Sequence, residues 1–161
     1  MSLSRRRRKL LFAAHLIVAV GLIGADAVLI SLTIAGFRGA DPVTVYPAAH
    51  RVASTVLVPL AWLALATGLL QGLATRWGLL RHWWVTIKLT LTAVLVGLAT
   101  FLLRPSLGEA ASTALTGAPL SSGAQLRLVL IPTAAVSVLI LIVSLAVYKP
   151  LGRLPRARSR R

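Results

Sequence analysis

The sequence predicts an all-α integral membrane protein, a bundle of four membrane-spanning helices with both termini on the cytoplasmic side. Of its 161 residues, 57% are hydrophobic and only 13% are charged, which is about half the charged share of an ordinary soluble domain. The mean hydropathy is +0.85. The apolar residues fall in four segments, each close to the ~20 residues that cross a hydrocarbon core of about 30 Å as a helix. These observations exclude a water-soluble globule.

The four spans follow one another along the chain, and charge, proline or glycine bounds each of them. We expect the spans at about residues 10–37, 52–74, 83–103 and 126–148, in a single transmembrane domain that covers residues 1–161. A short polar stretch and a tight turn connect the first three spans. A longer loop over residues 105–125, rich in Ser, Gly, Ala and Thr, is predicted between the last two, with a helical turn or two near its residues 109–115.

The first span also has an interpretation as a cleaved signal peptide. Basic residues precede an apolar run, and Ala25-Asp26-Ala27 resembles a small-x-small cleavage site. The apolar run nevertheless continues through Val28 to Phe37, which a cleaved signal does not require. The sequence therefore favours a retained span.

The basic residues indicate the orientation of the spans. Of the 18 Lys and Arg residues, 13 lie in the tails 1–9 and 149–161 or in the turn between the second and third spans. The positive-inside rule then places both termini in the cytoplasm, as in a protein of the cytoplasmic (inner) membrane, and Trp77, Trp83 and Trp84 lie at the same border. We expect the basic tails to contact anionic lipid headgroups, at ~1 kcal/mol per cation, and not nucleic acid.

Polar side chains within the spans are the candidate functional residues, because ionisable groups at membrane depth are costly. His15, Gln71 and Lys88 each lie roughly 6 to 7 Å inside the cytoplasmic edge at 1.5 Å per residue, and His82 lies at the mouth of the third span. These four residues predict a polar cluster. Two simpler interpretations remain: Lys88 snorkels to the headgroups, and His15 makes a structural hydrogen bond to a neighbouring helix.

Asp26 is the one acidic residue inside a predicted span. Arg51 opens the second span and Arg127 opens the fourth, both near the outer edge. A carboxylate at that level favours an arginine partner, so we expect an interhelical ion pair of Asp26 with Arg51 or Arg127. His15 and Asp26 are eleven residues apart and share one face of the first helix.

Small and hydroxyl residues indicate how the helices pack. Gly68 and Gly72 form a GxxxG motif, which is suited to close helix approach within the bundle and weakly indicates dimerisation. Three hydroxyl residues of the fourth span fall on one face and predict interhelical hydrogen bonds. They are Thr133, Ser137 and Ser144. Pro59 and Pro132 each lie about a turn into a span and predict kinks.

Several kinds of chemistry are missing from the sequence. Cysteine is absent, so disulfides, thiolate metal sites and a cysteine nucleophile are excluded. Three His and three acidic residues are few, and Asp26, Asp41 and Glu109 are scattered along the chain. We therefore expect no catalytic constellation and no protein-built metal site, and the sequence leans away from an enzyme.

One region resembles a known family. The stretch from Thr67 to Leu89 reads TGLLQGLATRWGLLRHWWVTIKL, and it is similar to the TGLxQ and WGLxRHxWVxxK pattern of small, uncharacterised four-span membrane proteins of high-GC actinobacteria. The Lys9-Leu10 and Ala14-His15 pairs also fit that pattern, whereas Asp26 stands where the family has an apolar or small residue. The resemblance implies the four-span fold and a membrane location. A more distant similarity, by helix count and membrane histidines, is to copper-resistance membrane domains and small haem-binding bundles.

Three functions follow as expectations. The first is a structural, accessory or interaction protein of the cytoplasmic membrane, as a homo-oligomer or with a membrane-protein partner. The second is a haem b or copper-handling protein that uses His15 and His82 as ligands, which requires the two rings to face each other. The third and weakest is a small transporter that uses Asp26 and Lys88.

Overall fold

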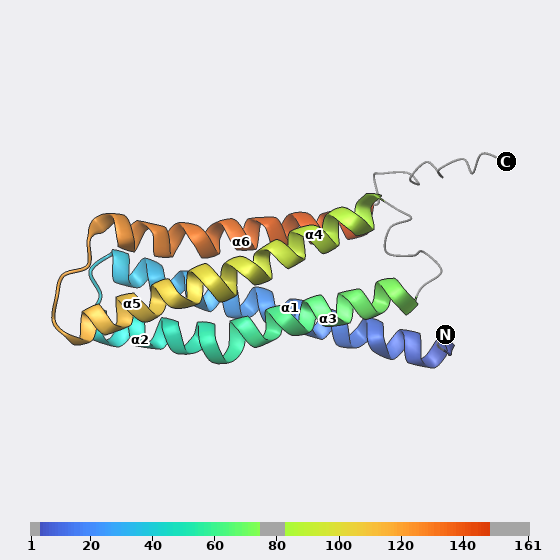
Figure 1. Ribbon diagram of the computed structural model, residues 1–161, viewed down its shortest axis with the longest axis horizontal. Coiled ribbons are helices and arrows are strands. Elements are labelled where there is room, and N and C mark those ends of the chain that lie inside the picture. Colours follow the sequence, from blue (N-terminus) through green and yellow to red (C-terminus); the bar gives the residue numbers. More distant parts are fainter. Residues whose placement is uncertain (1–3, 75–82, 149–161) are drawn as a thin grey trace.

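The computed structural model describes residues 4–74 and 83–148, of which 92% are helical, and this part of the chain contains no strand. The helices make four long rods, two of which are interrupted by a short π-helical segment (Figure 1). In chain order the rods are α1 (Arg5–Phe37); α2 (Pro42–Val52), η1 (Ala53–Leu57) and α3 (Val58–Ala74); α4 (Trp83–Leu98), η2 (Ala99–Leu103) and α5 (Arg104–Leu115); and α6 (Ser122–Tyr148). All four rods are long and apolar enough to cross a membrane.

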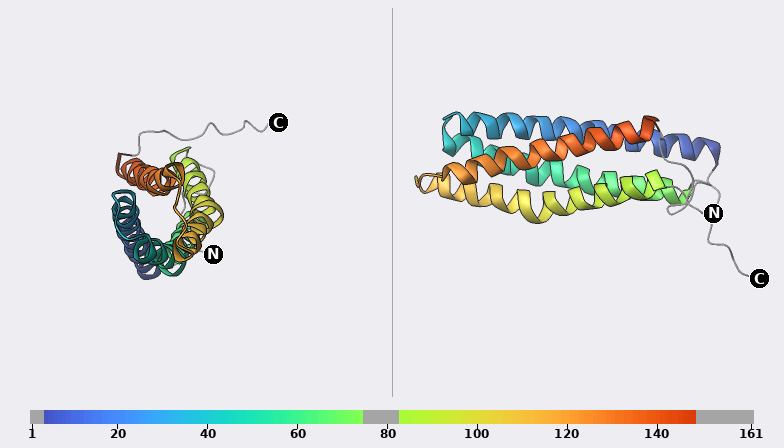
Figure 2. Two further views of the ribbon diagram at one scale, coloured as in Figure 1. Left: turned by 90° about the vertical axis from the view of Figure 1, so that its left-hand side faces the viewer. Right: turned by 90° about the horizontal axis from the view of Figure 1, so that it is seen from above.

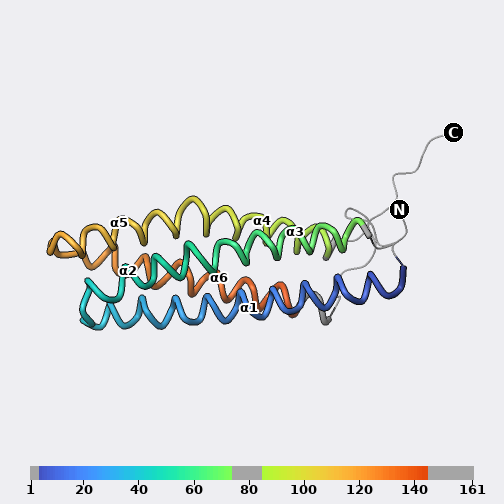
Figure 3. The backbone as a smooth tube through the Cα atoms, turned by 90° about the horizontal axis from the view of Figure 1, so that it is seen from below, coloured from blue at the N-terminus to red at the C-terminus, as the bar shows by residue number. Residues whose placement is uncertain are grey.

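The rods run up and down and form a closed ring. The start of α1, the end of α3, the start of α4 and the end of α6 lie at one end of the bundle (Figures 1 and 3). Each rod packs against the next one, and α6 packs back against α1, so that every rod has two neighbours (Figure 2). This is the arrangement of an up-and-down four-helix bundle with short connections.

The connection between α1 and α2 is built from local hydrogen bonds. Gly39 has a φ of +94°, the left-handed conformation that ends α1. Asp41 then caps α2, because its side chain accepts hydrogen bonds from the backbone N–H of Val43 at 3.3 Å and from the Thr44 hydroxyl. The Thr44 hydroxyl, followed by the Val43 N–H, holds the pKa of Asp41 below its ordinary value.

The rods are longer than the predicted spans, and the expected loop over residues 105–125 is wrong. Helix α5 continues to Leu115, which leaves a connection of only 116–121, and the second rod begins at Pro42. A proline inside a helix lacks an N–H and clashes with the carbonyl four residues before it. Pro59 and Pro105 each follow a π-helical segment by two residues, whereas Pro47 and Pro132 lie inside α2 and α6 with no such segment before them.

Alanine is frequent inside the bundle, and many large apolar residues lie on its outside. Alanine supplies eight of the buried hydrophobic positions: Ala25, Ala49, Ala53, Ala61, Ala64, Ala110, Ala111 and Ala114. By contrast, Phe12, Ile17 and Phe101 are 61%, 73% and 78% exposed. Membrane helices associate through small residues because lipid removes the hydrophobic drive that buries large ones in water. The structure therefore agrees with a multi-pass membrane protein.

Candidate functional site

The candidate site is centred on Asp26, a carboxyl group within the bundle. Asp26 lies on α1 and is only 2% exposed. Neither carboxylate oxygen has a hydrogen-bond partner in the described part of the chain. Most buried polar side chains in proteins are hydrogen-bonded, so an unpartnered buried carboxyl needs an explanation.

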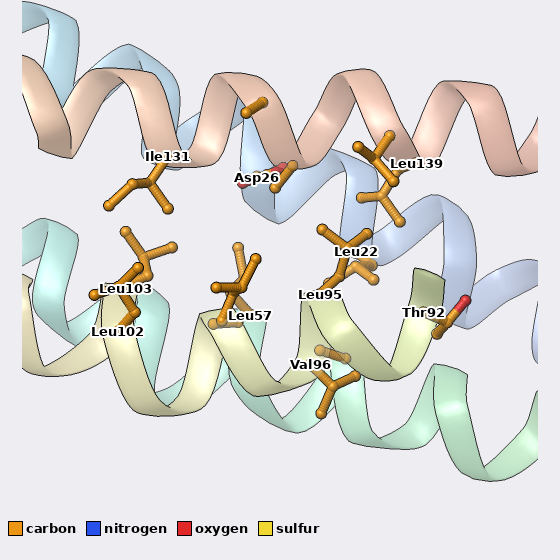
Figure 4. Close-up of a pocket in the computed structure, with 16 residues that line it drawn as sticks. Leu22, Asp26, Leu57, Thr92, Leu95, Val96, Leu102, Leu103, Ile131 and Leu139 are labelled. Carbon is orange, nitrogen blue, oxygen red and sulfur yellow. The ribbon is translucent and has the colours of Figure 1, made fainter. Parts of the chain in front are cut away.

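Asp26 faces a cavity of about 220 Å³ that is bounded by all four rods (Figure 4). Leu22 and Asp26 of α1 form one wall, and Leu57 and Ala61 of the second rod form the next. Residues of α4 and η2 and of α6 complete it: Thr92, Leu95, Val96, Leu98, Ala99, Leu102 and Leu103, with Ile131, Ala134, Ala135, Val138 and Leu139. The cavity is therefore apolar apart from Asp26 and Thr92.

Thr92 is the other polar residue of the lining, and its hydroxyl is engaged within α4. Its hydroxyl donates to the backbone carbonyl of Lys88 at 2.8 Å, one turn earlier in α4. A hydroxyl has a single hydrogen, so Thr92 has no hydrogen free to donate. An ionised Asp26 also only accepts hydrogen bonds. The polar atoms of the cavity thus match a ligand that donates.

Both π-helical segments border the cavity. Leu57 belongs to η1, and Ala99, Leu102 and Leu103 belong to η2. The two segments also pack against each other. Short π-helical segments inside α-helices occur frequently at functional sites, so the cavity coincides with the irregular part of both middle rods.

The cavity is not sealed on the side where η2 and the end of α4 approach α6. Three of its lining residues there are exposed: Leu98 at 42%, Leu102 at 45%, and Ala134. In Figure 4 this seam separates α6 from the rod that carries Leu95 and Leu102, with Asp26 of α1 behind it. Because the outside of the rods is apolar, the seam faces the part of the surface suited to lipid.

The expected ion pair of Asp26 with Arg51 or Arg127 is wrong. Both arginine side chains are exposed, and the Asp26 oxygens accept no hydrogen bond from any described residue. The depths of these residues along their helices are compatible with an ion pair, but the directions in which their side chains point are not. Asp26 points into the ring of helices, and the two arginines lie on its outer surface.

The structure brings part of the predicted polar cluster together at the opposite end from the α1–α2 connection. His15 Nδ1 lies 2.8 Å from the Thr67 hydroxyl, and Gln71 donates to the Leu11 carbonyl at 3.2 Å. Lys88 acts electrostatically on the His15 ring. His82 lies outside the described residues. The described members therefore join α1 to α3, with Lys88 contributed by α4.

The hydrogen bonds of Thr67 determine how His15 is held. The Thr67 hydroxyl donates to the Leu63 carbonyl at 2.7 Å and lies 2.8 Å from His15 Nδ1, so one hydroxyl of α3 holds the His15 ring in place. The ring also lies over Gly68, where a Cβ atom would approach the His15 Cε1 to 3.3 Å. The GxxxG glycine at 68 thus accommodates a side chain within the bundle. No group of three or more metal-ligating side chains occurs in the described ranges.

Interhelical hydrogen bonds were expected for the hydroxyl residues of α6, but among the described residues these hydroxyls bond within their own helix. Thr133, Ser137 and Ser144 donate to the carbonyls of Val129, Thr133 and Ile140 in their own helix, at 2.7 to 2.9 Å. All three bonds span four residues. A hydroxyl on a helix always has this carbonyl within reach, so its position in the sequence does not require a second helix.

Two close contacts at the end of the bundle that holds the α1–α2 connection were not predicted. His50 Nδ1 lies 3.3 Å from the Arg104 carbonyl, and its ring packs against Gly108. Tyr46 is 1% exposed, and a Cβ atom added to Gly36 would lie 2.9 Å from its hydroxyl oxygen. The sequence does not predict these contacts. His50 is distant along the chain from Arg104 and Gly108, and the contact of Tyr46 with Gly36 depends on the direction in which an aromatic ring points.

The chain was also compared with known proteins. No protein-family model, curated protein or solved structure matched it. The function is therefore argued from the geometry of the site.

Proposed function

We propose that this chain is a non-enzymatic multi-pass protein of the cytoplasmic membrane that binds a small, mainly apolar molecule inside its helix bundle, next to Asp26. The observation that carries this proposal is the unpartnered carboxyl facing an apolar cavity. A concave apolar site with one or two well-placed polar groups is typical of small-molecule binding. In this role the protein acts as an accessory subunit, bound to a membrane-protein partner or to a second copy of itself.

The energetic cost of Asp26 supports a role in binding. A buried polar group without a hydrogen bond costs roughly 1 to 3 kcal/mol in protein mutational data. A leucine or alanine at this position would avoid that cost and continue the apolar face of α1. Ionisable residues within membrane spans are for this reason functional candidates by default.

The composition of the cavity favours binding over catalysis. Among the described residues, its polar groups are one carboxyl and one hydroxyl whose hydrogen is already engaged. General acid–base or nucleophilic catalysis needs a second group within hydrogen-bond reach of the first. The described lining contains no such pair.

The proposed orientation has both termini in the cytoplasm, with the basic tails on anionic headgroups. The absence of native cysteine allows a direct test with the S4C and S121C variants and a membrane-impermeant maleimide. We expect S121C to react in intact cells and S4C to react only after lysis. The reverse pattern would contradict the orientation.

Access to the cavity is tested with diisopropylcarbodiimide, a small apolar reagent that modifies carboxyl groups. We expect peptide mass spectrometry of treated membranes to find the adduct on Asp26. The Ala61→Phe variant fills the cavity and should reduce labelling at least fivefold. Ala14→Phe, a matched change at an exposed position, should leave it unchanged. Absence of the adduct, or equal labelling in both variants, would contradict the proposal.

A further inference from the structure

We propose that the ligand of this cavity is a lipophilic amine in its cationic form, whose ammonium group pairs with the Asp26 carboxylate while its hydrocarbon part lies along α4, η2 and α6. This inference rests on the proposed function and names the chemical class of the bound molecule. Four properties of the site lead to it: the missing counter-charge, the hydrogen-bonding pattern, the volume and the open seam.

The described part of the protein provides no counter-charge for Asp26. Arg51 and Arg127 are exposed on the outside of the bundle. Lys88 is one turn from the lining residue Thr92, but it does not line the cavity and acts on His15 instead. An ionised carboxylate in an apolar interior is too costly to remain unpaired. Without a counter-charge the carboxyl stays protonated and neutral, and a cationic bound molecule would supply the positive charge that lets Asp26 ionise.

The hydrogen-bonding pattern distinguishes an amine from other ligands. An ionised Asp26 only accepts hydrogen bonds, Thr92 has no hydrogen free to donate, and an ammonium group offers up to three N–H donors. An anionic ligand is repelled by the carboxylate. A hard metal ion such as Ca²⁺ prefers six to eight oxygen ligands, and the described lining supplies oxygens from two side chains only. A cation with a small polar head and an apolar body fits best.

The volume limits the size of this molecule. An apolar cavity of about 150 Å³ holds one benzene molecule, and the present cavity has about 220 Å³. One aromatic ring with an aminomethyl group, or an alkylamine of comparable size, therefore fits. The walls that would contact the hydrocarbon part are leucine, alanine, valine and isoleucine side chains.

The open seam gives such a molecule a route from the bilayer. Leu98, Leu102 and Ala134 are exposed and also line the cavity. Alanine at 134, opposite the irregular η2 segment, leaves the seam with little side-chain volume on the α6 side. A lipophilic amine concentrates in the membrane and would enter between the rods, with no need to cross the polar ends of the bundle.

The test compares three ¹⁹F probes of nearly equal shape: 4-fluorobenzylamine, 4-fluorobenzyl alcohol and 4-fluorotoluene. The full chain is placed in nanodiscs of zwitterionic lipid, which do not attract cations, and binding is measured by ¹⁹F NMR titration. We expect the amine to bind at least tenfold more tightly than the alcohol. Asp26→Asn should abolish this preference. Glu109→Gln, which removes an exposed carboxyl, should preserve it.

The possible results separate the inference from the proposed function. Equal binding of all three probes to the native chain and to Asp26→Asn would overturn the amine inference but support an apolar binding cavity. Binding of none, in a protein whose Asp26 still reacts with the carbodiimide, would also overturn the inference alone. Binding of none together with an unreactive Asp26 would overturn both. Asp26→Leu serves as a second variant, and it should bind the toluene probe without preferring the amine.

Discussion

Replacement of Asp26 by leucine should stabilise the protein. Neither oxygen of the native carboxyl has a partner among the described residues, so the substitution removes no hydrogen bond and no ion pair. It removes a buried polar group whose cost is roughly 1 to 3 kcal/mol. The leucine side chain branches at the same atom and is bulkier, and the adjoining cavity of about 220 Å³ leaves room for it. We therefore expect the free energy of unfolding to rise by about 1 to 3 kcal/mol.

The sign of this change decides between the structure and the ion pair expected from the sequence. Breaking a buried ion pair by removing one partner costs about 3 to 5 kcal/mol, so an Asp26 paired with Arg51 or Arg127 would make the leucine variant much less stable. The assay is equilibrium unfolding in mixed micelles at increasing SDS, followed by circular dichroism. Glu109→Leu, an exposed carboxyl-to-leucine change, serves as control and should alter stability by less than about 0.5 kcal/mol. A loss of more than about 1 kcal/mol in Asp26→Leu, well outside the effect of a neutral surface change, would refute the reasoning.

Three further predictions concern contacts away from the cavity. Gly36→Ala should destabilise the protein, because the added Cβ lies 2.9 Å from the buried Tyr46 hydroxyl. Adding Tyr46→Phe to this variant should restore its stability. As a control, Gly24→Ala, whose Cβ would have no neighbour within 4 Å, should be neutral or stabilising by up to about 1 kcal/mol. Thr67→Val should lower the free energy of unfolding by about 0.5 to 1.5 kcal/mol through loss of the bond to His15, and an unchanged value would contradict a structural role for that bond. The lowered pKa of Asp41 means that its cap stabilises the fold above the ordinary pKa of 3.8 and ceases to do so as the pH falls through the lowered value. The difference in Tm between the native chain and Asp41→Ala should therefore shrink on acidification, and a difference that grows would contradict the cap.

The four rods were predictable from the sequence because apolar length alone reveals a membrane-crossing helix. The end of α1 at Phe37 was predicted too, but the helical residues 42–51, 104–115 and 122–125 were not predicted as parts of the rods. Pro105 reads as the start of a loop, since a proline normally interrupts a helix. In the structure the helix continues past Pro105, just after the π-helical segment η2, and η1 precedes Pro59 in the same way. A π turn has no sequence pattern of its own, so these continuations become visible only in three dimensions.

The candidate site was predictable in part and for a clear physical reason. Asp26 stands out because acidic residues are rare in membrane spans. Its surroundings were mistaken because helical rise gives the depth of Arg51 and Arg127 but not the direction in which they point. Thr92, which also lines the cavity, carries no signal at all, since threonines are common in membrane helices.

The most direct test of the account is a structure of the protein bound to 4-bromobenzylamine, with the bromine located by its anomalous scattering. The account predicts a bromine peak within the cavity between η2 and α6, and the ligand nitrogen within hydrogen-bond distance of an Asp26 carboxylate oxygen. A well-ordered protein in which the cavity remains without bromine at saturating amine, or in which the nitrogen points away from Asp26, would contradict it.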